Sequence, residues 1–288
     1  MNNTSITSTT PLQFDSLIQK LRGFFMRRNF KETFPQPNLS ILAACEDPKT
    51  VRSFKFNNNI WPLNQTNQMH LEHILMSHSD EVDGLYCLTA SYREEPNPIP
   101  NRHMLSFSMF ECESKGDFDN LLDTLSELMV HLGLVEHTSD IPFFTYNELC
   151  KHYGVDTLEA EHEAMIWKEY GDVVGITYFP SRTSPFFNMR YHGVDAKTGD
   201  GLYRKCDFII CGQETFGCAE RSTNVEEMRN SFYTISNGEY AKLLFEQFGK
   251  ERVELELETF LSLNMIERWG YGCGISRLMR AMKIKNLL

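Results

Sequence analysis

The segment SYREEPNPIPNRHMLSFSMFECE, residues 91–113, carries the first side chains that could do chemistry. Arg93 and Glu95 are separated by a single residue in an expected strand, so their side chains share one face. Beyond a proline-containing loop, further residues share a face in the same way: His103, Phe107, Glu111 and Glu113. Arg93 could bind an α-phosphate and Glu95 an adenine amino group, while Phe107 stacks on the ring. The spacing therefore fits a nucleotide site, although a hairpin with surface charges would also show it.

Asp207 and Glu214 are carboxylates within the largely apolar segment CDFIICGQETFGCAERS, residues 206–222. Buried carboxylates are costly unless they are paired or bind a cation, and magnesium is held by one or two carboxylates plus phosphates. The offset between Asp207 and Glu214 is odd, so one straight strand would point them to opposite faces. A turn or bulge near Gly212 must re-aim one of them, and Arg221 follows Glu214 at the same offset. The alternative is a hairpin with carboxylates at its rim.

A glycine-rich segment, RWGYGCGISRLMRAM, occupies residues 268–282. Its glycines at 270, 272 and 274 allow the backbone to approach a ligand closely. Arg277 falls in the first turn of the helix expected next, where acidic residues are usual, so an anionic partner is indicated. The dinucleotide fingerprint Gly-x-Gly-x-x-Gly is not satisfied, because Arg277 stands where the third glycine would be.

The elements that must position these residues follow from apolar periodicity and from proline and glycine breaks. Helices are predicted at about 13–29, 68–78, 117–134, 238–249, 254–264 and 274–284, with one or two shorter ones within 146–170. Strands are predicted at 84–93, 103–113, 172–179 and within 204–220. The strands come in pairs without regular β-α-β alternation, which favours an α+β fold with an antiparallel sheet.

Bulk properties narrow the class of protein. The chain has 288 residues and 41% hydrophobic residues, which suits one large domain. The net charge of −11 argues against binding nucleic acid through a broad basic surface. No apolar run approaches the roughly 20 residues of a membrane span, and the polar start lacks the features of a secretory signal. We expect a cytosolic, membrane-free protein with a disordered tail at 1–12, one domain at 13–288, and reduced, mostly buried cysteines.

Taken in order, the segments resemble the motifs of class II aminoacyl-tRNA synthetases. The strand end with Arg93-x-Glu95, the loop after it and the next strand, which carries Phe107, together resemble motif 2. The run from Gly272 to Arg277 resembles motif 3, whose pattern is Gly-x-Gly-x-x-Arg. NFKETFPQPNL resembles motif 1, with Pro37 as its proline. Motif 1 forms the dimer interface in that family, so the resemblance implies a homodimer.

Further segments narrow the resemblance to the aspartyl and asparaginyl enzymes: RHMLSF, NQTNQMHLE and FPSRTSPFFNM. The family then implies a fold, an α+β core with an antiparallel sheet of about six to seven strands flanked by helices. It implies ATP binding by a set of residues, namely Arg93, Glu95, His103, Phe107, Glu214, Gly274 and Arg277, of which Arg93 and Arg277 are catalytic. It also implies a magnesium site at Asp207 and Glu214, and an amino-acid site at Gln68, Glu72 and Arg221.

The chain departs from the family pattern at several positions. Ser106 and Ser276 replace glutamates, and Leu71 stands where aspartyl enzymes carry a lysine for the substrate carboxylate. Ammonia-dependent asparagine synthetases also have Ser-Arg at the position of Ser276. The segment before motif 1 is too short for the anticodon-binding barrel of these synthetases, so none is expected. This architecture resembles that of archaeal asparagine synthetases related to asparaginyl-tRNA synthetase.

The resemblance implies an AMP-forming ligase. A carboxylate of aspartate would attack the α-phosphate of ATP, and ammonia would convert the aspartyl-adenylate into asparagine. One alternative is transfer of activated aspartate or asparagine to another acceptor, such as tRNA, a protein or a small molecule. A tRNA acceptor is disfavoured by the expected architecture and by the charge, but is not excluded. The other alternative is a non-catalytic regulator that binds amino acid or ATP.

Overall fold

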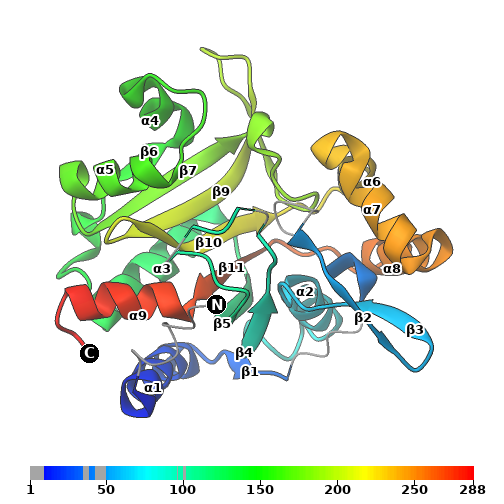
Figure 1. The fold of residues 1–288 in the computed structure, drawn as a ribbon, viewed down its shortest axis with the longest axis horizontal. Helices are drawn as coiled ribbons and strands as arrows, with labels where there is room; N and C mark the ends of the chain where they lie inside the picture. Colours follow the sequence, from blue (N-terminus) through cyan, green and yellow to red (C-terminus); the bar gives the residue numbers. More distant parts are fainter. Residues whose placement is uncertain (1–9, 35–38, 43–49, 96, 100–101) are drawn as a thin grey trace.

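A computed structural model describes residues 10–34, 39–42, 50–95, 97–99 and 102–288 (Figure 1). The strands in this part are β1 (Lys31–Glu32), β2 (Ser53–Phe56), β3 (Asn59–Pro62), β4 (Gly84–Tyr92), β5 (Ser106–Lys115), β6 (Phe143–Thr145), β7 (Val173–Pro180), β8 (Tyr191–Val194), β9 (Gly201–Ile210), β10 (Gln213–Arg221) and β11 (Arg268–Gly274). Among the described residues, nine of these strands form one sheet in the order β1-β4-β5-β11-β10-β9-β7-β6, with β8 paired to β9. The strands β2 and β3 form a separate hairpin.

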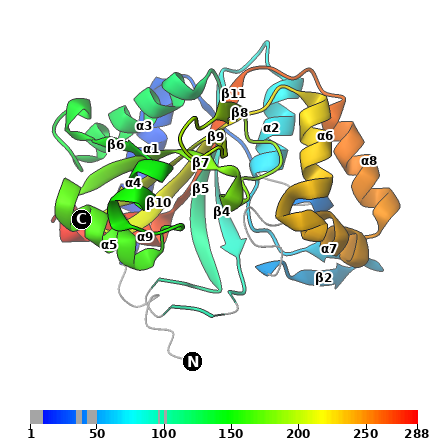
Figure 2. The same ribbon diagram turned by 90° about the horizontal axis from the view of Figure 1, so that it is seen from above.

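The α-helices are α1 (Pro11–Arg27), α2 (Gln68–Ser77), α3 (Phe118–Leu132), α4 (Tyr146–Tyr153), α5 (Ala160–Tyr170), α6 (Val225–Thr234), α7 (Glu239–Phe248), α8 (Lys250–Leu261) and α9 (Ile275–Ile284). Short 3₁₀ turns lie at Ser40–Leu42, Thr138–Asp140, Ser181–Thr183 and Ile235–Gly238. The helices α6, α7 and α8 gather at the opposite end of the molecule from α4 and α5 (Figures 1 and 2). No helix in the described ranges is both long and apolar enough to cross a membrane.

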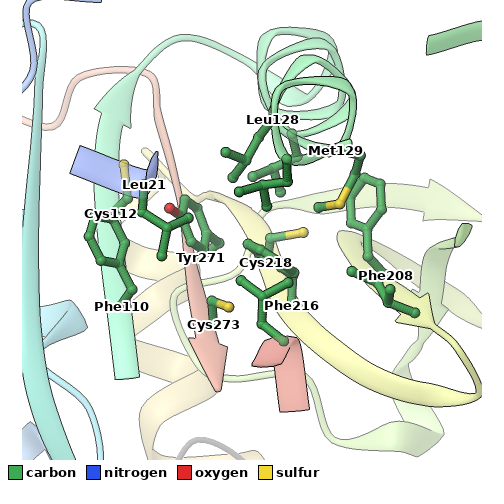
Figure 3. Packing of buried hydrophobic residues seen from close by; sticks show 14 of the residues in the cluster. Leu21, Phe110, Cys112, Leu128, Met129, Phe208, Phe216, Cys218, Tyr271 and Cys273 are labelled. Carbon is green, nitrogen blue, oxygen red and sulfur yellow. The ribbon is translucent and has the colours of Figure 1, made fainter. Parts of the chain in front are cut away.

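One face of the sheet holds the main hydrophobic core (Figure 3). Side chains alternate between the two faces along each strand, so the even-numbered residues of β5 and β9, and those of β10 from Phe216 onward, point here. They include Phe110, Phe208 and Phe216, and they pack under α1, α3 and α9. Every cysteine in the described part of the chain is a buried free thiol, as the sequence predicted, while Cys45 lies outside the described residues.

The opposite face of the sheet carries helices at both ends, and Ala219 of β10 packs there in a second apolar cluster with residues of α6, α7 and α8. Helix α2 packs Leu71 and Leu75 against Leu85 and Cys87 of β4. Helices α4 and α5 cover the β7 end, where Ile209 of β9 joins their apolar cluster. The middle strands β5, β11, β10 and β9 lie between α2 and the helices α4 and α5 on this face, and there the site described below is built.

The sheet differs from the expected fold in two ways. It has nine strands in the described part instead of six to seven, and its outer pairs β1–β4 and β6–β7 are parallel. The inner pairs are antiparallel as predicted. The extra strands at the two edges are short, Lys31–Glu32 and Phe143–Thr145, so neither leaves an alternation pattern in the sequence.

The first helix also begins earlier than predicted. Helix α1 starts at Pro11, inside the segment 1–12 that was expected to be a disordered tail. Thr10 forms a capping box with Gln13, and a proline in the first turn is compatible with a helix because its missing N–H has no partner there anyway. Residues 1–9 lie outside the described residues.

Candidate active site

The floor of the site is made of very small residues on β10 and β11. Residues paired across antiparallel strands point to the same face, so the register defines rows of neighbours. Two rows cross this face: Asp207–Gly217–Gly272–Glu111 and Lys205–Ala219–Gly270–Glu113. In each row, charged side chains on β9 and β5 flank glycine or alanine. We call this strip of small residues between charged side chains the trough.

A pocket of about 590 Å³, counting the part open to solvent, lies at one end of this trough. It is lined by all the residues that the sequence predicted for ATP: Arg93, Glu95, His103, Phe107, Glu214, Gly274 and Arg277. Arg102, Thr215 and Ser276 also line it. Residues separated by more than half the chain thus meet in one cavity.

Arg93 and Phe107 are brought together by the pairing of β4 with β5. Arg93 directly follows β4, and its backbone N–H donates to the carbonyl of Leu105 just before β5 begins (3.0 Å). Its guanidinium carbon lies 5.8 Å from the centre of the Phe107 ring. A cation and an aromatic face at this separation can hold the phosphate and the base of one nucleotide.

The surroundings of His103 favour its neutral form. Burial lowers the pKa of His103, and the positive charges of Arg277, Arg102 and Arg93 lower it further, against an opposite effect of Glu95. Its Nδ1 accepts a hydrogen bond from the backbone N–H of Ile99 (3.2 Å). With Nδ1 accepting, the proton of the neutral ring is on Nε2, so this nitrogen is the donor that His103 can offer.

Asp207 and Glu214 converge because the chain turns and bulges between them. Cys211 and Gly212 adopt left-handed backbone conformations, with φ of 47° and 79°, and the ladder shifts register between Glu214 and Phe216. A Cβ atom on Gly217 would lie 3.2 Å from Oε1 of Glu214 and 3.6 Å from Oδ1 of Asp207. Both carboxylates therefore lean over the same glycine. The turn or bulge predicted near Gly212 is confirmed.

This pair of carboxylates has the oxygen donors that magnesium prefers. No group of three or more histidine, cysteine, aspartate or glutamate residues with metal-binding geometry occurs in the described ranges, so substrate phosphates would have to complete the coordination. Oδ2 of Asp207 also accepts a hydrogen bond from the Lys205 ammonium (2.7 Å). That lysine was not recognised from the sequence, although a cation next to a buried carboxylate is the expected neutralising partner.

The predicted amino-acid residues lie at the other end of the trough. Nε2 of Gln68 donates to Oε1 of Glu72 (2.8 Å), and Arg221 lies 3.7 Å from the same oxygen. Arg221 also donates to both carboxylate oxygens of Glu113, at 2.5 and 3.2 Å. Burial raises the pKa of Glu113, and the charge of Arg221 acts against that rise. The sequence had placed Glu113 on this face without assigning it to the site.

Further partners of Glu72 were missed from the sequence. Arg268 donates to Oε2 of Glu72 (2.9 Å) and Asn188 donates to Oε1 (2.7 Å). Glu72, Arg268 and Asn188 are fully buried. Both partners lie in segments already singled out, RWGYGCG and FPSRTSPFFNM, and the need to neutralise a buried acid was the signal that could have found them.

Glu111 fixes the element that carries Gln68 and Glu72. Its carboxylate accepts hydrogen bonds from the hydroxyl of Thr66 and from the backbone N–H of Asn67 (2.9 Å), directly before α2 begins. A carboxylate at a helix N-terminus satisfies free N–H groups and favours the helix dipole. The start of α2 is thereby tied to β5, beside the trough.

Comparisons with known proteins identify the family of the chain. The family model "tRNA synthetases class II (D, K and N)" matches residues 7–286. The chain belongs to this family. The expected aspartyl/asparaginyl-type class II core is thus confirmed, and the chain has the fold of an aminoacyl-tRNA ligase. No curated protein sequence matches the chain. Pro37, assigned to motif 1, lies outside the described residues.

Solved structures of synthetases share the fold of this class II chain. Asparaginyl-tRNA synthetase from Pyrococcus horikoshii, complexed with asparaginyl-adenylate, has a TM-score of 0.73 at 19% identity, over 93% of this chain and 64% of that one. The Entamoeba histolytica enzyme with asparaginyl-adenylate has 0.72 at 18%, over 94% and 63%. A putative aspartyl-tRNA synthetase from Leishmania major Friedlin has 0.69 at 13%, over 93% and 61%. The chain spans less than two thirds of each of these structures.

Proposed function

We propose that this class II chain activates aspartate or asparagine with ATP, forming an aminoacyl adenylate and releasing pyrophosphate. The observation that carries the proposal is that the two groups of residues lie on the same face of the sheet. This face carries both the pocket of Arg93, Phe107 and Arg277 and the buried site of Glu72 and Arg221, with a floor of glycine and alanine between them. An amino acid and an α-phosphate would meet over that floor. The neighbours bound to asparaginyl-adenylate support the same reading.

The reaction needs no nucleophile from the protein, because a carboxylate of the substrate attacks the α-phosphate and pyrophosphate leaves. Positioning and charge neutralisation suffice for such a transfer. Arg93 and Arg277 would bind the phosphates, and Phe107 would hold the adenine ring. Asp207 and Glu214 would hold magnesium together with the phosphates. When bound, magnesium neutralises the charge that develops on the phosphate oxygens.

The charges of the amino-acid site favour asparagine. Glu72 and Glu113 balance Arg221 and Arg268, so the site has no excess positive charge for a second carboxylate. A side-chain amide offers one acceptor, which suits Arg221, and two donors, which suit Glu113. Aspartate would place its carboxylate next to Glu113, and like charges there repel. This proposal therefore ranks asparagine above the aspartate expected from the sequence.

Asparagine synthesis from aspartate and ammonia is the second candidate. The observation in its favour is Ser276, which lines the nucleotide pocket where the related tRNA synthetases carry a glutamate. Burial also raises the pKa of Glu113, which lessens its repulsion of aspartate if it takes up a proton. Ammonia would then attack the adenylate and release AMP.

Product analysis tests these proposals. The protein is incubated with ATP and magnesium, and with either asparagine and total tRNA or aspartate and ammonium. AMP formation supports attack at the α-phosphate, whereas ADP would contradict it. Free asparagine that forms only with ammonium supports the second candidate. Acid-precipitable asparaginyl-tRNA supports transfer to tRNA. Tight binding of ATP and amino acid without any product would support a non-catalytic regulator.

A further inference from the structure

Glu163 of α5 lies against the nucleotide pocket, far in sequence from every motif described above. Its side chain is 13% exposed. Oε2 accepts a hydrogen bond from the backbone N–H of Glu214 (2.8 Å), and the two oxygens accept from the two terminal nitrogens of Arg102, at 2.9 and 2.5 Å. One carboxylate thus joins three parts of the chain: α5, the loop before β5 and the strand β10.

The bond to Glu214 falls at the bulge of β10. The extra residue of a bulge disrupts the ladder locally, so backbone groups there need other partners. The N–H of Glu214 is bound by Glu163, and its carbonyl oxygen accepts from Nη1 of Arg277 (2.7 Å). Side chains from α5 and α9 therefore hold both polar groups of this residue. This fixes the direction in which its carboxylate leans over Gly217.

The bond to Arg102 acts on a second part of the pocket lining. Arg102 lines the nucleotide pocket, and its side chain is as little exposed as that of Glu163. Paired, parallel hydrogen bonds between a guanidinium and a carboxylate constrain orientation as well as distance. The loop that carries Arg102 is therefore tied to the helix that also holds Glu214.

We infer that Glu163 is a positioning residue for both the metal carboxylate Glu214 and the nucleotide-binding loop of Arg102. The inference rests on the proposed function, because it assumes that Glu214 binds a divalent cation together with ATP. Glu163 touches neither ligand and acts through the backbone of one residue and the side chain of the other. Partners of metal ligands typically change metal affinity by about 10- to 100-fold when they are removed.

Two substitutions separate these two roles. Glu163→Ala removes the acceptor for Glu214 and the partner of Arg102. Glu163→Gln keeps an amide oxygen that can accept from the Glu214 N–H, but it cannot neutralise Arg102. We expect Glu163→Ala to weaken Mn²⁺ binding about 10- to 100-fold and to weaken nucleotide binding as well. Glu163→Gln should restore Mn²⁺ affinity to within a few-fold of wild type while nucleotide affinity stays low.

The experiment measures Mn²⁺ binding by electron paramagnetic resonance with a non-hydrolysable ATP analogue, and binding of the analogue by calorimetry. Glu161→Gln, at an exposed position of the same helix, is the matched control, and thermal melts verify folding. Equal Mn²⁺ affinity in wild type and Glu163→Ala would overturn the inference, as would a glutamine variant no better than alanine. Absence of Mn²⁺ binding in the wild-type protein would instead overturn the proposed metal site itself.

Discussion

Lys205 places a fixed positive charge beside one of the two proposed metal carboxylates. Its ammonium lies 2.7 Å from Oδ2 of Asp207 and 3.8 Å from the centre of the Phe179 ring, and it is nearly buried. A cation at this distance opposes a second cation at the same carboxylate, because charges interact strongly where water is largely excluded. The divalent-ion affinity of the site should therefore be set in part by this lysine.

Replacing the lysine tests that conclusion. Lys205→Met keeps the length and apolar packing of the side chain and removes its charge. We expect Mn²⁺ to bind at least about tenfold more tightly in the presence of a non-hydrolysable ATP analogue, because Asp207 loses a competing cation. Calorimetric titration measures the affinity. Weaker binding in a variant that melts like wild type would show that Lys205 helps to build the metal site.

Arg221 should separate amino-acid recognition from nucleotide binding. It contacts Glu113 and Glu72 and does not line the nucleotide pocket. Arg221→Ala should abolish the stimulation of catalysis by amino acid, since removing one arm of a buried charge pair typically costs several kcal/mol. Binding of a fluorescent ATP analogue should change little. An equal loss of amino-acid stimulation and of ATP-analogue binding would mean that Arg221 contributes to the ATP site.

We expect Glu113 to determine whether the site prefers a substrate with a side-chain amide or one with a side-chain carboxylate. Glu113→Gln removes one negative charge and leaves Arg221 and Arg268 opposite Glu72 alone. The site then carries excess positive charge, so the preference should move toward aspartate by about tenfold or more. The ratio of kcat/KM for the two amino acids measures this. An unchanged ratio would remove Glu113 from the specificity argument.

Part of this residue-level picture was predictable from the sequence. The odd offset between Asp207 and Glu214 required a turn or bulge, and the chain has both at Cys211–Gly212 and Glu214. The hydrogen bonds of the buried Glu72 with Arg268 and Asn188 were not predictable, because those partners lie far along the chain and meet Glu72 only in the folded protein. The assigned roles of the site residues stay predictions until they are tested.

At the scale of elements, β11 was the main strand missed. It sits between β5 and β10, yet its sequence RWGYGCG contains glycines that disfavour a strand by local propensity. Tertiary context overrides that propensity, because the Glu113 side chain lies over Gly270, where a larger residue would clash. Helix α6 was also missed, whereas α2, α3, α7 and α9 lie close to their predicted positions.

Two glycines of this strand give a matched comparison. A Cβ at Gly270 would lie 1.9 Å from Oε1 of Glu113, which Arg221 holds in place. A Cβ at Gly272 would meet only the terminal methyl of Met109, at 2.6 Å. Gly270→Ala should lower the free energy of unfolding by about 1–3 kcal/mol, and Gly272→Ala by clearly less. Urea unfolding measures both, and equal losses would contradict the proposed packing of Glu113.

At the scale of the whole molecule, helices cover one face of the sheet, and on the other face the site lies between α2 and the helices α4 and α5. The α+β class and the antiparallel centre followed from paired strands without β-α-β alternation. The parallel edge strands could not be predicted from the sequence, because elements of two or three residues carry no periodic signal. The homodimer and the magnesium requirement remain predictions. The net charge of −11 gave no indication of the local positive charge, because Arg93, Arg102 and Arg277 line one pocket of an acidic chain.

The central claim is adenylation of an amino acid, and ATP–pyrophosphate exchange measures it most directly. The protein is incubated with ATP, magnesium and labelled pyrophosphate, with each standard amino acid in turn. We predict magnesium-dependent exchange that asparagine or aspartate stimulates, with asparagine the better of the two. Stimulation by aspartate alone would favour asparagine synthesis. Well-folded protein that shows no exchange with any amino acid would contradict the account.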